Sequence, residues 1–507
     1  MMLYLTTPIF YVNAQPHLGH AYTAVVADAV VRFARLDGNE VFFQTGTDEH
    51  GDKIVQAARE AGVEVREYTD RISALFRQAW PILEVEPDNF IRTTDPEHIR
   101  VVQGILQQVH DQGDIYFSDY TGHYCRGCER FLTDKELSDG KCPDHQVPPE
   151  EIREQNYFFR MSRYQQWLIE HIKEHPEFIT PERYRNEVLS FLSEPLDDLC
   201  ISRPLSRLEW GIPLPFDENF VTYVWFDALI NYISGIGYPD AADFAPRWAA
   251  AEHLIAKDIL KPHAIFWPTM LRAMGLPPYR RLHVHGYWNV NEAKMSKSIG
   301  NVVRPQGMVE QFGADTVRYF LLREMSFGLD ASYSDEAVLA RRNSDLANDL
   351  GNLFSRSLTM VKNFADSRVP TPGPLNAEDQ ELADACLAML ESYGQHMRQF
   401  AFRQALEVVW EVIGRANRYI VTNAPWELAK EPGREERLAT VLNTLLETLR
   451  CIATTLGPVM PGAAAKMAAA LPLEAGLTLA GQRRWGVLPV GGAVTVGDNL
   501  FPRLKKG

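Results

Sequence analysis

Hydrophobic and polar positions near the start of the chain change from a strand pattern to a helix pattern and back. An apolar run over residues 3–7 precedes a loop, and residues 17–36 then place small and apolar side chains at helical spacing. A second apolar run follows Glu40 and ends in a polar loop that contains glycine. A strand, a helix and a strand in this order predict a βαβ unit with a parallel sheet, whose ligands lie beyond the carboxyl ends of the strands.

The pattern changes twice farther along the chain. Residues 116–215 combine a cysteine cluster, a proline pair and charged stretches with scattered aromatic side chains, which indicate an insertion. Strand-like runs then return and predict the second half of the same sheet; they cover residues 219–233, 253–260 and 281–290. Beyond about Asp330 the pattern is helical almost throughout, and it predicts a helical bundle with helices over residues 335–364, 377–400, 401–420 and 433–455.

Composition narrows the class of protein. The chain has 507 residues, of which 46% are hydrophobic and 23% charged, so it is typical of a globular protein with several domains. No apolar run approaches the ~20 residues of a membrane span, and no basic segment precedes the first apolar stretch, so we expect a cytoplasmic protein without membrane contact. The net charge of −15 argues against a uniformly basic nucleic-acid surface but leaves room for local RNA-binding patches.

Two short motifs have the residue types that phosphate chemistry needs. His17-Leu18-Gly19-His20 stands where a loop enters the first helix, so both histidines lie on one helical face beside the backbone amides that attract phosphate. Lys294-Met295-Ser296-Lys297-Ser298 places two lysines on a loop of small residues, where their ammonium groups could stabilise a departing pyrophosphate. Either motif alone could be an ordinary solvated surface, but together, in this order, they indicate a nucleotide site.

A cysteine and histidine cluster predicts a metal site. Cys125-x-x-Cys128 is followed after thirteen residues by Cys142-x-x-His145. Two chelating pairs of this kind suit four-coordinate Zn²⁺ in a structural site, since four protein ligands leave no open position for catalysis. Reduced cysteines without metal are the alternative interpretation.

The two phosphate motifs are similar to the signatures of class I aminoacyl-tRNA synthetases. Nearly the whole chain, from Leu3 to about Arg503, resembles the methionyl-tRNA synthetase family. The resemblance implies a Rossmann-like catalytic domain that activates L-methionine with ATP and Mg²⁺ and transfers it to the 3′ end of tRNA(Met). It also implies a zinc knuckle in the connective insertion, with one Zn²⁺ per chain.

The resemblance assigns roles to particular residues of this chain. His17, His20, Lys294 and Lys297 are implied to be catalytic, and ATP is implied to be bound by His17, Gly19, His20 and Lys297. The methionine pocket is implied to consist of Ile9, Tyr11, Asp48, Trp225, Ala228, Leu229, Tyr232, Ile259 and His263. Leu229 replaces a proline that some relatives have. A polarizable thioether gains from aromatic edges, and a carboxylate such as Asp48 complements the α-amino group. Without the resemblance, the aromatic members of this set would be read as ordinary core.

The long helix after Asp330 carries Asn348, Asn352 and Arg356 at intervals of four residues. By resemblance, Asn352, Arg356 and Trp426 correspond to the residues that read the CAU anticodon, because an indole can stack on a splayed base while amide and guanidinium groups donate hydrogen bonds. A solvated helix face is the alternative interpretation.

The expected fold is therefore α/β, with a split parallel-sheet catalytic domain, a zinc-knuckle insertion and a helical anticodon-binding bundle. The expected boundaries are residues 1–115 and 216–290 for the two catalytic halves, 116–215 for the insertion, 291–340 for the lysine loop and stem-contact region, and 341–507 for the bundle. We expect no further C-terminal RNA-binding domain, and this expectation favours a monomer.

Two other functions remain open at this point. One is a sibling class I synthetase for cysteine or a branched-chain amino acid, although the insertion is short for a large editing domain. The other is a noncatalytic zinc-containing RNA-binding relative. The presence of His17, His20, Asp48 and Lys297 argues against decay of the catalytic set.

Overall fold

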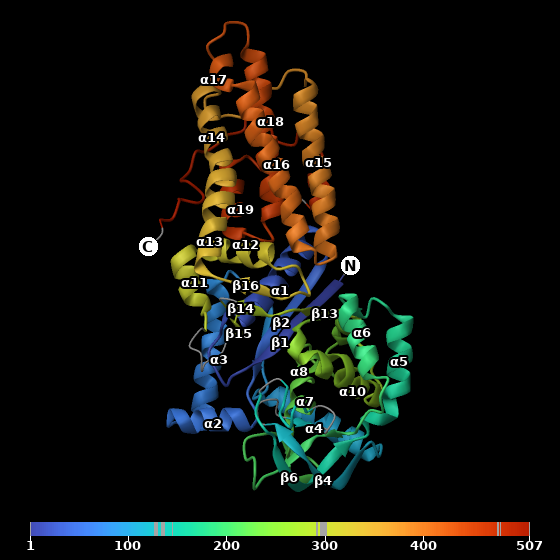
Figure 1. Ribbon diagram of the computed structural model, residues 1–507. Helices are drawn as coiled ribbons and strands as arrows, with labels where there is room; N and C mark the ends of the chain where they lie inside the picture. Colours follow the sequence, from blue (N-terminus) through green and yellow to red (C-terminus); the bar gives the residue numbers. More distant parts are fainter. Residues whose placement is uncertain are drawn as a thin grey trace.

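A computed structural model describes residues 2–125, 130–132, 137–143, 146–290, 293–294, 302–473, 476 and 478–505. Its centre is a six-stranded sheet with the order β3-β2-β1-β12-β13-β7, in which every neighbouring pair is parallel. The strands are β1 (Met2–Tyr11), β2 (Glu40–Asp48), β3 (Asn89–Arg92), β7 (Ile179–Thr180), β12 (Ala251–Ala256) and β13 (Arg281–His285). The expected parallel sheet is thus confirmed (Figure 1).

Helices cover both faces of this sheet, as a parallel sheet requires. Neighbouring side chains on β1 point to opposite faces, so that Leu5 packs into the core beside α1 while Tyr4 packs into a second core beside α4 and α10. The helices that follow or flank the strands are α1 (Leu18–Leu36), α2 (Asp52–Ala61), α3 (Val65–Ile82), α4 (Pro96–Asp111), α5 (Gln165–Glu174), α6 (Glu182–Phe191), α9 (Phe244–Trp248) and α10 (Trp267–Ala273).

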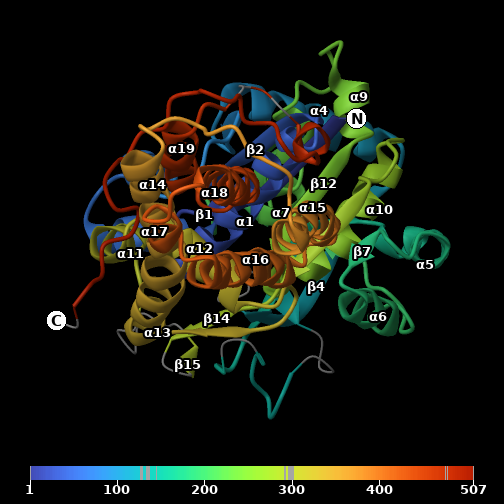
Figure 2. The same ribbon diagram turned by 90° about the horizontal axis from the view of Figure 1, so that it is seen from above.

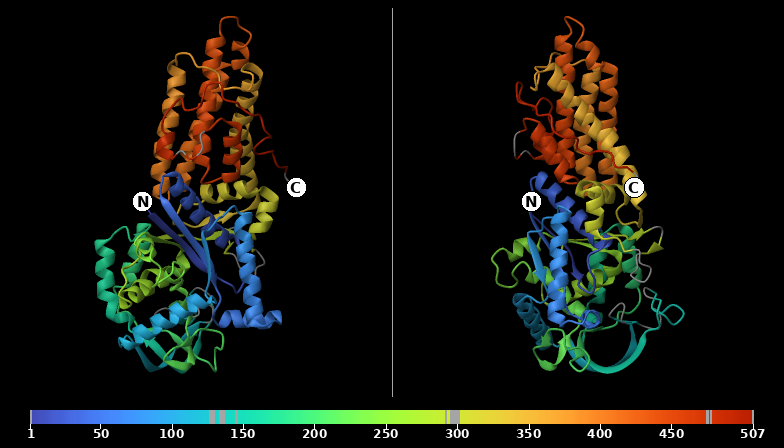
Figure 3. Two further views of the ribbon diagram at one scale, coloured as in Figure 1. Left: turned by 180° about the vertical axis from the view of Figure 1, so that it is seen from behind. Right: turned by 90° about the vertical axis from the view of Figure 1, so that its left-hand side faces the viewer.

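The antiparallel strands of the region between the two halves of the sheet form a separate layer at the end opposite the bundle (Figures 1 and 3). One antiparallel sheet has the order β5-β4-β6-β8, with β4 (Ile115–Cys125), β5 (Arg130–Leu132), β6 (Glu150–Phe159) and β8 (Leu199–Cys200). A second has the order β10-β11-β9, with β9 (Ser202–Pro204), β10 (Pro213–Leu214) and β11 (Asp217–Thr222). The main sheet also takes its edge strand β7 from within residues 116–215, the range expected to be an insertion.

The apolar run at residues 219–233 was expected to be a strand of the main sheet, and this expectation is wrong. The first residues of the run form the end of β11, which belongs to a small antiparallel sheet. The rest of the run forms two short helices, α7 (Val224–Ala228) and α8 (Asn231–Ser234). The reason is that almost every side chain in this stretch is buried. A segment that is apolar on all sides has no periodicity to separate a buried strand from a buried helix.

The C-terminal part is a bundle of long helices, as expected from the pattern, and it stands on one end of the sheet domain (Figures 1 and 2). The first helical segment of the bundle is continuous and consists of α13 (Asp335–Arg341), the π-helix η5 (Arg342–Gly351) and α14 (Asn352–Phe364). The others are α15 (Ala377–Arg398), α16 (Phe402–Asn423), α17 (Pro425–Leu428), α18 (Glu435–Leu456), α19 (Pro461–Ala470) and α20 (Leu479–Gln482). Within the described ranges, no helix has the length and apolar character needed to cross a bilayer.

A junction region connects the sheet to the bundle. It contains α11 (Pro305–Phe312), α12 (Ala314–Glu324) and a small sheet of β14 (Trp288–Val290), β15 (Ala293–Lys294) and β16 (Ala331–Tyr333). One hydrophobic core runs from α1 and α3 through α12 into the bundle helices. The two parts of the molecule are therefore packed on each other and not merely tethered.

Candidate active site

A cavity of about 790 Å³ opens where the strands of the main sheet end. This is the place where ligands bind in open parallel sheets. Twelve residues singled out in the sequence line it: Ile9, Tyr11, His17, Gly19, His20, Asp48, Trp225, Ala228, Leu229, Tyr232, Ile259 and His263. Residues that are up to 254 positions apart (Ile9 to His263) therefore share one cavity.

His17 and His20 form the start of α1. The Nδ1 atom of His17 accepts a hydrogen bond from the Gly19 amide at 3.1 Å, and the Nδ1 atom of His20 accepts one from the His17 amide at 3.2 Å. The two rings stack with centroids 3.7 Å apart. Since both Nδ1 atoms are acceptors, a neutral ring carries its proton on Nε2. Burial and the neighbouring His17 lower the pKa of His20 well below its usual value, so its Nε2 donates without bringing a charge into the cavity.

Tyr232 and His263 form a buried hydrogen-bonded pair in another part of the cavity wall. The Tyr232 hydroxyl lies 2.6 Å from Nε2 of His263, while Nδ1 of His263 lies 2.9 Å from the Ile259 carbonyl oxygen. Because a carbonyl can only accept, Nδ1 of His263 donates and Nε2 accepts from the tyrosine. Burial lowers the pKa of His263 to about 4. Trp225 lies edge-on to His263, with centroids 6.5 Å apart, so this wall is aromatic, neutral and fixed in orientation.

The end of β2 provides the one carboxylate of the predicted pocket set. Asp48 is 5% exposed and lies opposite Tyr11 of β1 in the strand register. The residue after it, Glu49, turns away and is held by Arg92 at 2.7 Å. Tyr11 in turn donates its hydroxyl to the His50 carbonyl oxygen at 3.1 Å. Asp48 is thus the acidic group that β2 contributes to the cavity, which Glu187 and Asp258 line from other elements.

A buried network that the sequence did not indicate lies behind the aromatic wall. Asp227, two positions after Trp225, accepts hydrogen bonds from Nδ1 of His50 and from Nε2 of His98, each at 2.7 Å. Burial opposes ionisation of Asp227, but the two histidines outweigh it and hold its pKa below the usual range. The network ties α7, the end of β2 and α4 together. No spacing rule connects these three residues, since they lie on separate elements.

The sequence did not indicate several other residues that line the cavity. His285 and Gly286 end β13, and the His285 ring is 2.8 Å from the Thr23 hydroxyl of α1. A side chain at Gly286 would meet the Leu329 carbonyl oxygen at 2.2 Å, so only glycine fits there. The rule that ligands lie beyond the carboxyl ends of strands could have marked this pair. Phe191 of α6 also lines the cavity, and no sequence signal connects that helix with the site.

The lysine motif lies only partly within the described residues. Lys294 ends the short strand β15, which pairs with β14 beside the cavity residue Trp288. Lys297 lies outside the residues that the structure describes, and so its expected contact with pyrophosphate stays a prediction.

Two of the four expected zinc ligands are described, and the structure brings them together. Cys125, at the end of β4, and Cys142 share a small buried cluster with Leu137. The Cys142 carbonyl accepts a hydrogen bond from the Gln146 amide at 2.8 Å. Cys128 and His145 lie outside the described residues. Within the described part of the chain, no group of three metal-ligating side chains is assembled.

The three residues expected at the anticodon site lie together on the bundle. Asn352 and Arg356 are one turn apart on α14, and the Arg356 guanidinium carbon lies 5.9 Å from the centre of the Trp426 ring on α17. Trp426 is 38% exposed. Asn348 differs from them, because its side chain accepts hydrogen bonds from Arg503 at 2.7 and 3.1 Å and so anchors the C-terminal segment.

The sheet, the cavity at its strand ends and the histidine pair at the start of α1 together define a nucleotide-binding catalytic domain of the aminoacyl-tRNA synthetase type. Comparison with protein families agrees, since the model described as "tRNA synthetases class I (M)" matches residues 3–149 and 145–358. A second model, described as the anticodon binding domain of methionyl tRNA ligase, matches residues 369–506.

Known proteins resemble the chain over almost its full length. A methionine–tRNA ligase of Caldanaerobacter subterraneus is 45% identical over 503 residues, which cover 99% of this chain and 78% of the relative. The ligase of Thermotoga maritima is 41% identical over 509 residues, covering 99% and 80%. The methionyl-tRNA synthetase of Mycobacterium tuberculosis in complex with methionyl-adenylate superimposes with a TM-score of 0.95 at 42% identity, covering 99% of this chain and 100% of that one.

The chain belongs to the methionyl-tRNA synthetase family.

Proposed function

We propose that the chain is a methionine–tRNA ligase, which joins L-methionine to ATP to give methionyl-adenylate and pyrophosphate and then transfers methionine to tRNA(Met) for protein synthesis. One observation carries the proposal: the His17–His20 pair and the Tyr232–His263 wall face the same cavity of about 790 Å³. A phosphate site and an aromatic side-chain site in one cavity allow a carboxylate to attack a nucleotide phosphate. Synthesis of protein places this work in the cytoplasm.

The first step forms a bond between a methionine carboxylate oxygen and the α-phosphorus of ATP, and the bond to pyrophosphate breaks. Negative charge grows on the phosphate oxygens in the transition state. The neutral His20 ring donates from Nε2 to those oxygens, and His17, capping the same helix, lies beside it. Gly19 leaves the backbone accessible to the nucleotide, Lys294 and Lys297 of the lysine motif neutralise the departing pyrophosphate, and Mg²⁺ accompanies ATP.

Selection of methionine depends on the aromatic wall. Ile9, Ala228, Leu229 and Ile259 provide apolar surface, while the edges of Trp225 and Tyr232 suit a polarizable sulfur. The neutral His263–Tyr232 pair already satisfies its own hydrogen bonds, so it favours an uncharged side chain. Asp48 complements the α-ammonium group, with Tyr11 beside it. In the second step, a ribose hydroxyl at the 3′ end of the tRNA attacks the methionyl carbonyl and AMP leaves.

We also propose that the bundle reads the anticodon through Asn352, Arg356 and Trp426. The exposed indole offers a stacking surface, and the adjacent guanidinium offers donors to a base edge. The bundle could thus bind tRNA in spite of the net charge of −15, because three side chains form a local patch.

The zinc knuckle belongs to the same proposal. The buried contact between Cys125 and Cys142 fits a Zn²⁺ held by these two thiolates together with Cys128 and His145. When bound, the metal stabilises the fold of the insertion. Metal analysis of protein purified without chelator should give one zinc per chain. Cys142→Ser should lower that content, whereas Cys386→Ser, at a buried cysteine of the bundle, should not. Absence of zinc from the unmodified protein would contradict the knuckle.

The decisive experiment for the function is ATP–pyrophosphate exchange without tRNA, measured for each of the twenty amino acids. Strong preference for methionine is the expected result, since the aromatic edges of the wall suit its polarizable thioether. Exchange driven by cysteine or a branched-chain amino acid would keep the class of enzyme but overturn the pocket assignment. Absence of exchange with every amino acid would contradict the proposal as a whole.

A further inference from the structure

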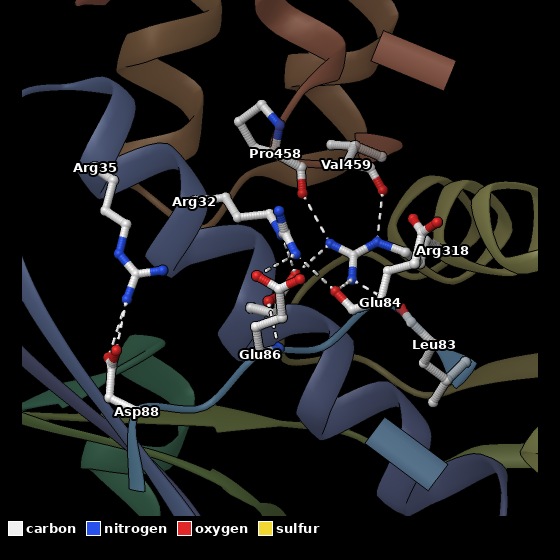
Figure 4. Close-up of polar contacts among 10 residues, drawn as sticks. Arg32, Arg35, Leu83, Glu84, Glu86, Asp88, Arg318, Pro458 and Val459 are labelled. Atoms are coloured by element: carbon white, nitrogen blue, oxygen red, sulfur yellow. Dashed lines mark hydrogen bonds and ion pairs between the residues drawn. The ribbon is translucent and has the colours of Figure 1, made fainter. Parts of the chain in front are cut away.

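Arg318 lies on α12 at the junction between the sheet domain and the bundle, and its side chain is fully buried. All five of its N–H groups have an acceptor. Nε donates to the Val459 carbonyl at 2.8 Å, and Nη2 donates to the Pro458 carbonyl at 3.0 Å and to the Asp28 carboxylate at 2.6 Å. Nη1 donates to the carbonyl oxygens of Leu83 at 3.1 Å and Glu84 at 3.3 Å (Figure 4).

These acceptors come from three separate segments. Asp28 lies on α1, Leu83 and Glu84 lie between α3 and β3, and Pro458 and Val459 connect α18 to α19. The planar guanidinium group is the only side chain with five donors in a fixed arrangement. Because the charge is buried, its loss or displacement would leave the carbonyl oxygens of Leu83, Pro458 and Val459 without their guanidinium partner and would remove one donor from Asp28. The guanidinium group can therefore meet its five acceptors in only one arrangement.

Asp28 connects this contact to the active site. It lies eight residues after His20 on α1, which corresponds to about 12 Å along the helix and about 80° around its axis. Asp28 also accepts a hydrogen bond from Arg32 at 2.8 Å and from the Glu86 amide at 3.2 Å. A helix held at this point cannot rotate or slide without moving the His17 cap and the His20 ring. The contacts of Asp28 therefore fix the position and orientation of the histidine pair through α1.

The other side of the contact belongs to the bundle. Pro458 and Val459 follow the last turn of α18, a helix of 22 residues and so about 33 Å long. α17, which carries Trp426, packs against α18 at the end of the bundle farthest from the sheet (Figure 1). One straight helix thus spans from the proposed anticodon surface to the carbonyl groups that bind Arg318.

We propose that Arg318 is a positioning residue for methionine activation and transfer: it fixes α1, with His17 and His20, against the end of α18, so that the geometry of the phosphate site depends on the bundle. The inference rests on the proposed function, because it assigns the histidines their role in that reaction.

A second ion pair between the bundle and α1 provides the matched control. Arg398 of α15 binds Asp37, which caps the far end of α1, at 2.6 Å. The Arg398 side chain is 51% exposed, and an exposed pair of this kind is worth little. It joins the same two parts of the molecule but does not enclose a buried charge.

The experiment compares Arg318→Lys with Arg398→Lys in the full chain, with kinetics normalised to active sites titrated by adenylate formation. For Arg318→Lys we expect kcat of methionine-dependent exchange to fall about 10-fold to 100-fold, as for small misplacements of catalytic groups. The KM for methionine should stay within about twofold, because the methionine pocket is formed by other elements. Arg398→Lys should match the unmodified protein in both constants. Asp28→Asn, which keeps the shape and the acceptor oxygen, should show the same split if Arg318→Lys does not yield folded protein.

A double-mutant cycle with Trp426→Ala tests the link to the bundle. If Arg318 connects the two parts, its substitution and Trp426→Ala should be non-additive in aminoacylation by about fivefold, as for coupled residues. Independent, multiplying effects would overturn the dependence on the bundle. A fall in the number of titrated sites with unchanged kcat per site would show that Arg318 only stabilises the fold, and would overturn the proposal. Failure of the unmodified protein to exchange with methionine would instead contradict the proposed function.

Discussion

Burial lowers the pKa of four histidines around the centre of the sheet domain: His20, His253, His263 and His285. Three of them, His20, His263 and His285, line the cavity, and a hydrogen bond to the backbone sets the tautomer of each neutral ring. A site that binds a triphosphate benefits from uncharged hydrogen-bond donors, because the position of such donors does not change with the charge around them. At the scale of single residues, the proposed function depends on which ring nitrogen of these histidines carries the proton.

Replacement of Tyr232 by phenylalanine should weaken methionine recognition. The change removes the hydroxyl that donates to Nε2 of His263 and leaves a buried acceptor without its partner. The cost of such a loss is about 1–3 kcal/mol, so we expect kcat/KM for methionine in the exchange reaction to fall about 10-fold.

Tyr393→Phe is the matched control for that measurement. Tyr393 is buried in the bundle, and its hydroxyl makes no hydrogen bond within the described part of the chain. Its replacement should leave the exchange kinetics unchanged. Equal losses in both variants would contradict a specific role for the Tyr232–His263 pair.

The buried histidines also predict how stability depends on pH. Burial lowers the pKa of His263 and of His285 from 6.5 to about 4. Between these values the unfolded chain binds protons that the native protein does not, so the free energy of unfolding increases with pH. The unfolding temperature should therefore fall as pH is lowered from 6.5 towards 4. His285→Gln removes one such group and should make this decrease shallower; an unchanged slope would contradict the assignment of His285.

Among the elements, α1 and the end of β2 are those whose proposed role follows most directly from their sequence. The motif that begins α1 combines a helix cap with the proposed phosphate site, so one local pattern predicts both. The segments that follow β11 are different: α7 and α8 carry Trp225 and Tyr232, but their apolar sequence predicts a strand. The residues of the pocket were identified by resemblance, whereas the element that holds them was not.

An acidic group on α12 gives a prediction for the junction between the two parts. Burial, together with the nearby carboxylate of Glu84, raises the pKa of Asp315 from 3.8 to about 6. Above this value the native protein holds a charge that the unfolded chain exposes to water, so stability attributable to Asp315 falls as pH rises from 3.8 to 6. Asp315→Asn keeps an oxygen that can accept the Gly462 amide. Its stability relative to the unmodified protein should be greater at about pH 8 than at about pH 5, as measured by urea unfolding.

Asp366→Asn, on an exposed turn after α14, is the control for this comparison. We expect its effect on the free energy of unfolding to be the same at both pH values. A pH-independent difference for Asp315→Asn as well would show that the Asp315 carboxyl is ionised in the native protein as readily as in the unfolded chain.

The whole molecule divides the reaction between two distant surfaces. The cavity lies at the strand ends of the sheet domain. The exposed Trp426 belongs to α17, which lies at the end of the bundle farthest from the sheet (Figure 1). The continuous core through α12 and the buried Arg318 contact join them into one body. Long helices suit this arrangement, since they span the distance with few residues.

Replacement of Trp426 by alanine should separate the two activities. Loss of the indole removes a stacking surface worth about 1–3 kcal/mol per base, so charging of tRNA(Met) should fall about 10-fold or more while methionine-dependent exchange is retained. Phe364→Ala, at another exposed aromatic residue of the bundle, is the control and should spare both reactions. Parallel loss of exchange and charging in Trp426→Ala would contradict the division.

The sequence by itself determined the parallel sheet, the helical bundle, the histidine and lysine motifs and, through resemblance, the set of residues that line the cavity. These features are local or periodic, so neighbouring residues are enough to reveal them. Only the tertiary structure decided the contacts of Asp227 with His50 and His98, the place of His285 and Gly286, the strand β7 inside the expected insertion, and the burial of Arg318 between three segments. Each of these depends on side chains from separate elements that meet only after folding, and no spacing along the chain encodes such a meeting.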